Sequence, residues 1–174
     1  MRVLLAAVLV IFLGSCGSMK PEQFENTGPE LNLFAYFDGR TQAWGIFEDR
    51  FGNLRREFKV VIDGTVKGDT LILDEDFIYK DGEKSRRVWT IIKKDDHNFV
   101  GTADDIIGVA EGISYGNALN WKYSMDLKVE NSLWRVKFDD WLFRQVDDVI
   151  VNKAKVTRWG FEIGTVTLFF KKDA

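Results

Sequence analysis

The sequence predicts an all-β protein, built as an antiparallel up-and-down barrel of roughly 8–10 strands. Three observations predict this class. Apolar and polar residues alternate with a period of two over most of residues 31–171. Glycine and acidic turn residues separate the alternating segments, and no proline follows Pro29. Beyond the first residues, no segment carries the apolar period of a long helix.

The chain begins with an apolar segment that is typical of an export signal. Arg2 is followed by an unbroken apolar run from Val3 to Leu13. This run is too short to cross a bilayer as a helix, and small residues follow it. The run has no polar face, which argues against the alternative of a buried N-terminal helix.

The end of this run resembles the bacterial lipobox. In Leu13-Gly14-Ser15-Cys16, a small pair directly precedes the only cysteine of the chain. The resemblance implies cleavage before Cys16 and acylation of that residue, so residues 1–15 are the predicted lipoprotein signal peptide. Two or three acyl chains, at about 0.8 kcal/mol per buried methylene, would hold the protein firmly to a membrane. Gly17 stands where an inner-membrane retention signal has Asp, which favours the periplasmic face of the bacterial outer membrane.

Residues 16–30 are predicted to form an acylated tether, and residues 31–174 a single β-barrel domain. Both prolines lie in the tether, together with turn-forming residues. Loss of Arg2 with the signal peptide leaves 23 of the 24 basic residues against 27 acidic ones, with the signs interspersed. This balance gives no electrostatic footprint for nucleic acid and no attraction to anionic lipid heads. Membrane contact is therefore expected through the acylated Cys16.

The clearest strand covers residues 119–129. Six apolar side chains point one way, and five polar side chains point the other way. The apolar set is Leu119, Trp121, Tyr123, Met125, Leu127 and Val129. This is the pattern of a strand with one buried face. Similar patterns predict the other strands, at about 32–37, 42–50, 54–66, 71–79, 85–93, 97–103, 106–115, 134–142, 146–157 and 161–171.

Closure of the sheet is inferred from the short connections between these strands. A flat sheet of this length would leave edges that promote aggregation, and closure into a barrel removes them. A sandwich of two sheets is the main alternative. The barrel is favoured because no long crossover connection is evident.

Five strands each place one polar residue in the apolar phase. These residues are Arg56, Glu75, Arg87, Asp140 and Asn152. An unpaired charge is costly in an apolar interior, so these groups are expected to pair, to meet water in a cavity or to lie at a rim. The two acids could balance the two arginines. Asp139 points outward on this pattern and cannot act with Asp140 as an acid–base pair.

Two interpretations of this polar cluster remain open. It could lie in a ligand cavity, with Trp44, Trp89, Trp121, Tyr123 and Trp134 as walls. Alternatively, it could be an internal ion-pair network that fills the barrel and fixes the register of the strands.

The sequence offers little support for catalysis or for a metal site. His97 is the only histidine and is expected to lie in a solvated turn, so a histidine-based triad or a His-rich metal site is excluded. The acidic pairs lack the spacing of a calcium loop. No cofactor is expected.

Several blocks of the chain resemble the bacterial lipoproteins of the domain-of-unknown-function 3833 family. They include "LDEDFIYKDG", "FVGTADDIIGVAEGISYGNALNWKY", "KFDDWLF" and "VNKAKVTRWGFEIG". The resemblance implies an envelope lipoprotein with a lipocalin-like (calycin-type) barrel. The resemblance also associates the chain with gene neighbourhoods for fatty-acid modification, which points to a lipid ligand. It implies no catalytic residues.

The resulting hypothesis is an outer-membrane-anchored lipoprotein whose barrel binds a small amphipathic ligand, such as a fatty acid. The hypothetical ligand-binding residues are Arg56, Glu75, Arg87, Trp89, Trp121, Tyr123, Asp140 and Asn152. Arg56 or Arg87 would meet a carboxylate head group. One alternative is an interaction module with a filled barrel, which docks a partner through exposed aromatic residues such as Phe34, Trp159 and Phe161. A third is a lipid-modifying enzyme that uses Glu75 or Asp140.

Overall fold

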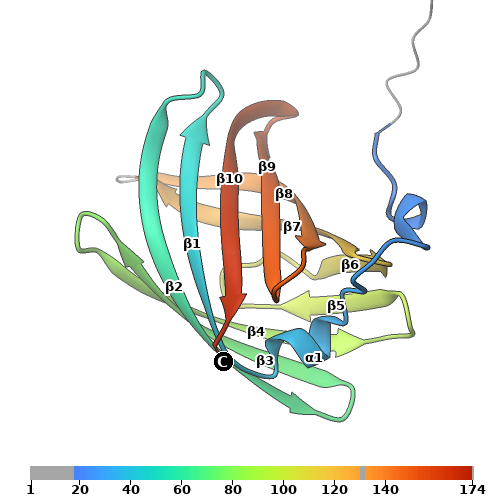
Figure 1. The fold of residues 1–174 in the computed structure, drawn as a ribbon. Helices are drawn as coiled ribbons and strands as arrows, with labels where there is room; N and C mark the ends of the chain where they lie inside the picture. The colour runs from blue at the N-terminus through green and yellow to red at the C-terminus, as the bar shows by residue number, and fades with distance from the viewer. Residues whose placement is uncertain (1–17, 130–131, 174) are drawn as a thin grey trace, which may run out of the picture.

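Ten antiparallel strands close into a barrel in the computed structural model, which describes residues 18–129 and 132–173 (Figure 1). Each strand pairs with its neighbours in sequence, and β10 returns to pair with β1. The predicted up-and-down barrel is thereby confirmed, and the sandwich alternative is wrong. The strands are β1 Gly39–Asp49, β2 Leu54–Lys67, β3 Thr70–Tyr79, β4 Lys84–Lys93, β5 Asn98–Thr102, β6 Ala110–Tyr115, β7 Ala118–Val129, β8 Ser132–Arg144, β9 Val149–Arg158 and β10 Phe161–Lys172. The predicted signal peptide and Cys16 lie outside the described residues.

The core lies inside the barrel because alternate residues of each strand point inward. Large side chains that are almost completely buried there include Val60, Ile62, Leu71, Val136, Ile150 and Val156. Each comes from the apolar phase of its strand. Burying such side chains removes apolar surface from water at roughly 25 cal/mol per Å², which makes this core the main stabilising term of the fold.

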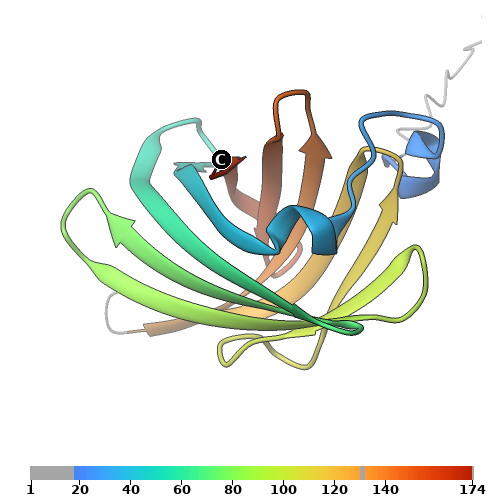
Figure 2. The same ribbon diagram turned by 60° about the horizontal axis from the view of Figure 1, so that its bottom comes forward.

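Residues 33–37 form a helix, so the strand predicted at 32–37 is wrong. The helix α1, Leu33–Phe37, begins after Asn32, whose side chain accepts a hydrogen bond from the backbone N–H of Ala35 at 3.0 Å. Leu33, Tyr36 and Phe37 are all buried. Their spacing of three and four residues places them on one face of a helix. Figure 2 shows α1 lying across one end of the barrel, which it closes.

Two predicted strands begin later than expected. The strand predicted at 106–115 starts at Ala110, because residues 103–109 form a loop with one isolated bridge between Ile106 and Met125. The strand predicted at 146–157 starts at Val149, after a turn in which Asp147 and Asp148 have positive φ angles.

The described part of the predicted tether packs against the outside of the barrel. The 3-10 helix η1, Pro21–Phe24, places the Phe24 ring 5.5 Å from that of Phe143 and 6.0 Å from that of Trp141. Further along, the backbone N–H of Leu31 donates to the carbonyl oxygen of Gly116 at 2.8 Å. The chain therefore reaches α1 along the β6–β7 turn.

Gly64 allows α1 to sit close to the barrel wall. A Cβ atom at this position in β2 would lie 1.6 Å from the carbonyl oxygen of Phe37. Gly64→Ala is therefore expected to displace α1 and to lower the free energy of unfolding by about 3 kcal/mol, as for an overpacked core site. Chemical denaturation followed by tryptophan fluorescence would measure the loss. The control is Thr65→Ala on β2, which tests a change of similar size without the clash. Gly68→Ala is unsuitable as a control because Gly68 has a positive φ.

Candidate ligand-binding cavity

A cavity of about 540 Å³ occupies the barrel between α1 and the opposite end. This volume falls within the usual range for small-molecule sites. Leu33 and Phe37 of α1 form its floor. The part of the cavity farthest from α1 is lined by residues near the β1–β2, β3–β4 and β7–β8 turns, including Phe47, Tyr79 and Leu127. The cavity therefore opens at the end of the barrel away from α1.

All eight residues selected from the sequence line this cavity. They are Arg56, Glu75, Arg87, Trp89, Trp121, Tyr123, Asp140 and Asn152. The rest of the wall is mainly apolar and includes Phe58, Val60, Ile62, Phe77, Phe138 and Val156. An empty volume of this size is inconsistent with an ion-pair network that fills the barrel.

Aromatic rings form one side of the cavity. The ring of Trp89 meets those of Trp121 and Tyr123 edge-on, at centroid distances of 5.8 and 5.4 Å. Tyr123 stacks on Phe138 at 4.9 Å. Gly101 and Gly112 leave room for the Trp121 indole, since a Cβ atom at Gly112 would lie 2.3 Å from that ring.

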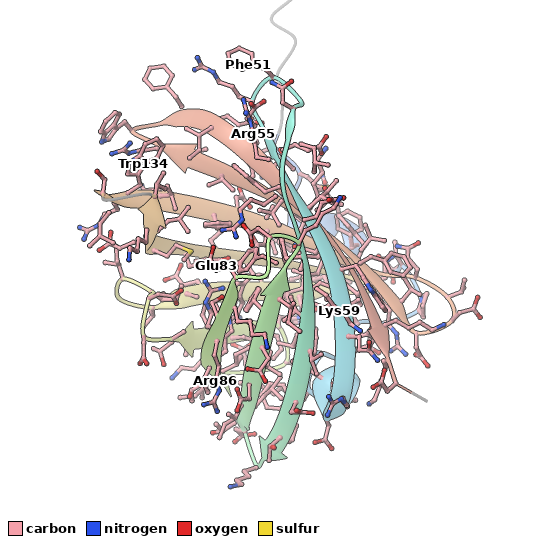
Figure 3. All side chains as sticks on the ribbon, turned by 90° about the vertical axis from the view of Figure 1, so that its left-hand side faces the viewer. Phe51, Arg55, Lys59, Glu83, Arg86 and Trp134 are labelled. Carbon is pink, nitrogen blue, oxygen red and sulfur yellow. The ribbon has the colours of Figure 1, made fainter. Side chains whose placement is uncertain are left out.

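Two of the tryptophans expected in the wall lie elsewhere. Trp44 points outward, with 45% of its surface exposed, because Ala43 and Thr41 occupy the inward phase of β1. Trp134 lies near the open end, where the guanidinium of Arg158 stacks on its ring at 4.0 Å. Figure 3 shows Trp134 at the edge of the barrel.

The deep arginine is paired with a residue that the sequence pattern missed. Arg87 donates to both carboxylate oxygens of Asp105, with its Nε 3.0 Å from Oδ1 and its Nη2 2.7 Å from Oδ2. Burial alone would lower the pKa of Arg87, but the hydrogen bonds to Asp105 reverse this and raise it. Asp105 lies in the loop after β5, where alternation does not predict side-chain direction.

The rim arginine is paired as well. Arg56 Nη2 donates to Glu83 at 2.8 Å and to Asp81 at 3.1 Å, and its guanidinium lies 3.8 Å from the centre of the Tyr79 ring. The expected pairing of Arg56 and Arg87 with Glu75 and Asp140 is therefore wrong, because each arginine has a carboxylate partner on a turn or loop.

The two interior acids have high pKa values. Burial raises the pKa of Glu75 to about 7, and the nearby Arg87 offsets only part of this effect. Burial, together with the charge of Asp139, raises the pKa of Asp140 to about 8, although Arg87 and the hydroxyl of Tyr123 act in the opposite direction. Among the described residues, Asp140 Oδ1 is enclosed without a hydrogen-bond partner. Asp139 lies outside the cavity and accepts a hydrogen bond from Asn120 at 2.6 Å.

The open end displays exposed apolar side chains. Seven large apolar residues of the described chain are more than half exposed, and five of them lie at the β1–β2, β7–β8 and β9–β10 turns of this end. These five are Phe51, Leu54, Leu133, Trp159 and Phe161. We call them the apolar rim; Figure 3 shows Phe51 at the outermost tip of its turn. Trp159 is 82% exposed at a φ of 53°, a conformation that bulky residues rarely adopt.

Two further sequence expectations concern single residues. Phe34 packs against the core, with its ring 6.0 Å from that of Phe99, so it is not an exposed contact. His97 is exposed in a bend, as expected, but its Nδ1 lies 2.9 Å from the carbonyl oxygen of Ser114 and its ring stacks on Tyr115 at 4.0 Å.

Residues 18–129 and 132–173 contain no group of three or more His, Cys, Asp or Glu side chains arranged to hold a metal ion. Within the same residues, neither helix is long and apolar enough to cross a membrane.

The architecture defines the class of the protein as a lipocalin-like barrel with an internal cavity. An S-type phycobiliprotein lyase from Guillardia theta has a similar solved structure, with a TM-score of 0.63, 10% sequence identity, and coverage of 90% of this chain and 99% of the lyase chain. At that identity the likeness shows the fold alone. Residues 10–172 match the family described as "Protein of unknown function (DUF3833)", and the chain belongs to that family. No curated protein matches the sequence.

Proposed function

We propose that the protein is a lipoprotein of the bacterial cell envelope, held at the periplasmic face of the outer membrane by acylated Cys16, whose barrel binds a small amphipathic lipid. The observation that carries the ligand-binding part is the cavity of about 540 Å³, which has mainly apolar walls and a few enclosed polar groups. Sites for amphipathic molecules combine these two features. The lipobox at Leu13–Cys16 supports the anchor.

The apolar chain of the ligand would lie along the aromatic side of the cavity. Trp89, Trp121 and Tyr123 offer a continuous surface there, and Phe58 and Phe77 face the same space. A polar group of the ligand would reach the level of Glu75 and Asp140. The lyase whose fold this chain shares is named for an activity on phycobiliproteins, which gives no support for that activity here.

Mass spectrometry of organic extracts from natively purified protein tests this proposal. We expect one lipid class in near-equimolar amount. Ala154→Phe, which adds a ring inside the cavity, should reduce the bound lipid at least tenfold. Lys155→Phe adds the same ring on the outer face of the same strand and should not reduce it. Far-UV circular dichroism would confirm that both variants fold. Equal loss or retention of lipid in the two variants, or wild-type protein without lipid, would contradict ligand binding in the barrel.

The apolar rim favours a second candidate function, in which the open end docks an envelope protein. Trp159 and Phe161 stand out from the β9–β10 turn and contribute little to the core. Photo-crosslinking residues placed at these two positions should capture one discrete partner in cells. The control position is Val146, which is 71% exposed at the opposite end. Capture at all three positions alike would exclude a specific role for the rim.

A further inference from the structure

Four basic residues line the cavity as a whole, namely Arg55, Arg56, Arg87 and Lys128, but its deep part around Arg87 has more acidic than basic groups. Three carboxyl groups, those of Glu75, Asp105 and Asp140, lie near a single deep guanidinium, that of Arg87. Asp105 occupies this guanidinium with two hydrogen-bonded oxygens, and Asp140 Oδ1 has no hydrogen-bond partner among the described residues. Once Asp140 is ionised, the unmet requirement inside the cavity is therefore for a hydrogen-bond donor or a positive charge.

Of the cations nearer the opening, Arg55 and Arg56 are already paired, and Lys128 is exposed at the mouth, seven residues along β7 from Trp121, the register partner of Asp140. Arg56 is held by Asp81 and Glu83, and Arg55 lies 2.6 Å from Asp49. A carboxylate brought to the level of Asp140 would lose its water and face two acids. A fatty-acid head group bound by Arg56 or Arg87, as expected from the sequence, does not fit this arrangement.

We propose that the cavity selects amphiphiles whose polar group is a hydrogen-bond donor, with an amine preferred to an alcohol, and that it discriminates against carboxylates. This inference rests on the proposed lipid-binding function and specifies its ligand class. The amine or hydroxyl would donate to Asp140 and Glu75, while its alkyl chain lies against the aromatic side of the cavity. Both acids line the cavity, so a ligand reaches them without unfolding of the barrel.

The preference for an amine should increase with pH. The charged and titratable groups around the site are Arg55 and Arg56 on β2, Glu75 and Tyr79 on β3, Arg87 on β4, Asp105 in the loop after β5, Tyr123 and Lys128 on β7, and Asp139 and Asp140 on β8. Of these, Glu75 and Asp140 change charge between pH 6 and pH 9, because their pKa values are raised to about 7 and about 8. Ionisation strengthens attraction to an ammonium group and strengthens repulsion of a carboxylate.

Three ligands with the same ten-carbon chain test the inference: decylamine, 1-decanol and decanoate. Displacement of the uncharged probe N-phenyl-1-naphthylamine from the purified protein would give their relative affinities at pH 6 and pH 9. At pH 9 we expect decylamine to bind at least tenfold more tightly than decanoate, with 1-decanol between them. At pH 6 the ratio of amine to carboxylate affinity should be several-fold smaller.

Asp140→Asn keeps the shape of the side chain and removes its charge. In this variant the amine-to-carboxylate ratio at pH 9 should fall at least fivefold, whereas the affinity for 1-decanol should change little. Asp76→Asn changes an acid on the outer face of β3 and should leave all three affinities unchanged. Binding of all three ligands with equal affinity, or tightest binding of decanoate, would overturn the head-group inference but leave ligand binding intact. Binding of neither the probe nor any ligand would instead overturn the proposed function.

Discussion

Arg87→Met is expected to lower the free energy of unfolding at pH 8 by about 3 kcal/mol, because it leaves buried carboxyl groups without their cation. Arg87 is only 20% exposed and makes three hydrogen bonds to Asp105. Its neighbours Glu75 and Asp140 gain further repulsion when it is removed. Methionine retains much of the apolar volume of the side chain, so the loss reports mainly on charge. Urea denaturation at pH 8 would measure it.

The adjacent arginine provides a matched control. Arg86 points outward from the same strand, is 63% exposed, and forms its hydrogen bonds with Asp74 on the surface. Exposed pairs of this kind contribute little to stability, so Arg86→Met should have a much smaller effect. At pH 5, where Glu75 and Asp140 are protonated, the loss caused by Arg87→Met should shrink. Equal losses for the two variants would show that Arg87 does not neutralise an interior charge.

The wild-type protein should be less stable at pH 9 than at pH 5, by an amount on the order of 6 kcal/mol. The pKa values of Glu75 and Asp140 rise from 4.5 and 3.8 to about 7 and about 8 on folding. Above the unfolded-state pKa values of 4.5 and 3.8, Glu75 and Asp140 keep protons in the folded state that they have released in the unfolded state. Stability is therefore fully present below about pH 4 for these two groups, and it is lost as the pH rises through 7 to 8.

Denaturation midpoints measured from pH 5 to pH 9 would test this pH dependence. Asp140→Asn should remove a large part of the loss and make the protein more stable than the wild type at pH 9. Asp76→Asn, on the outer face of β3, should reproduce the wild-type curve. A wild-type stability that is constant or rises over this range would show that the interior acids are ionised in the folded state.

Counting alternate residues predicted the interior of the barrel well. Arg56, Glu75, Asp140 and Asn152 face the cavity because each lies in a long, regular strand whose apolar phase is unambiguous. The same rule cannot describe α1, where a short apolar segment fits a strand and a helix equally well until the Asn32 cap is considered. The prediction that Trp44 lines the cavity was wrong because the inward phase of β1 is occupied by the small residues Thr41 and Ala43, and the large Trp44 lies on the outer face.

The pairing of the polar groups could not be predicted from the sequence. Alternation gives the face of each residue but no distance across the barrel. Arg87 and Glu75 are direct neighbours on β4 and β3, yet the partner that hydrogen-bonds to Arg87 is Asp105, 18 residues along the chain in an irregular loop. Both arginines pair with carboxylates that lie outside the strands, Asp81 and Glu83 in the β3–β4 turn and Asp105 in the loop after β5, where alternation gives no side-chain direction.

The packing of η1 and the following residues beside the β6–β7 turn has a consequence for the proposed membrane anchor. The polypeptide leaves toward its N-terminus at the sealed base of the barrel, next to α1. Under the proposed function, acyl chains on Cys16 would hold this base near the bilayer, and the opening would face away from it. A lipid ligand would then enter the barrel from the aqueous side rather than directly from the anchoring leaflet.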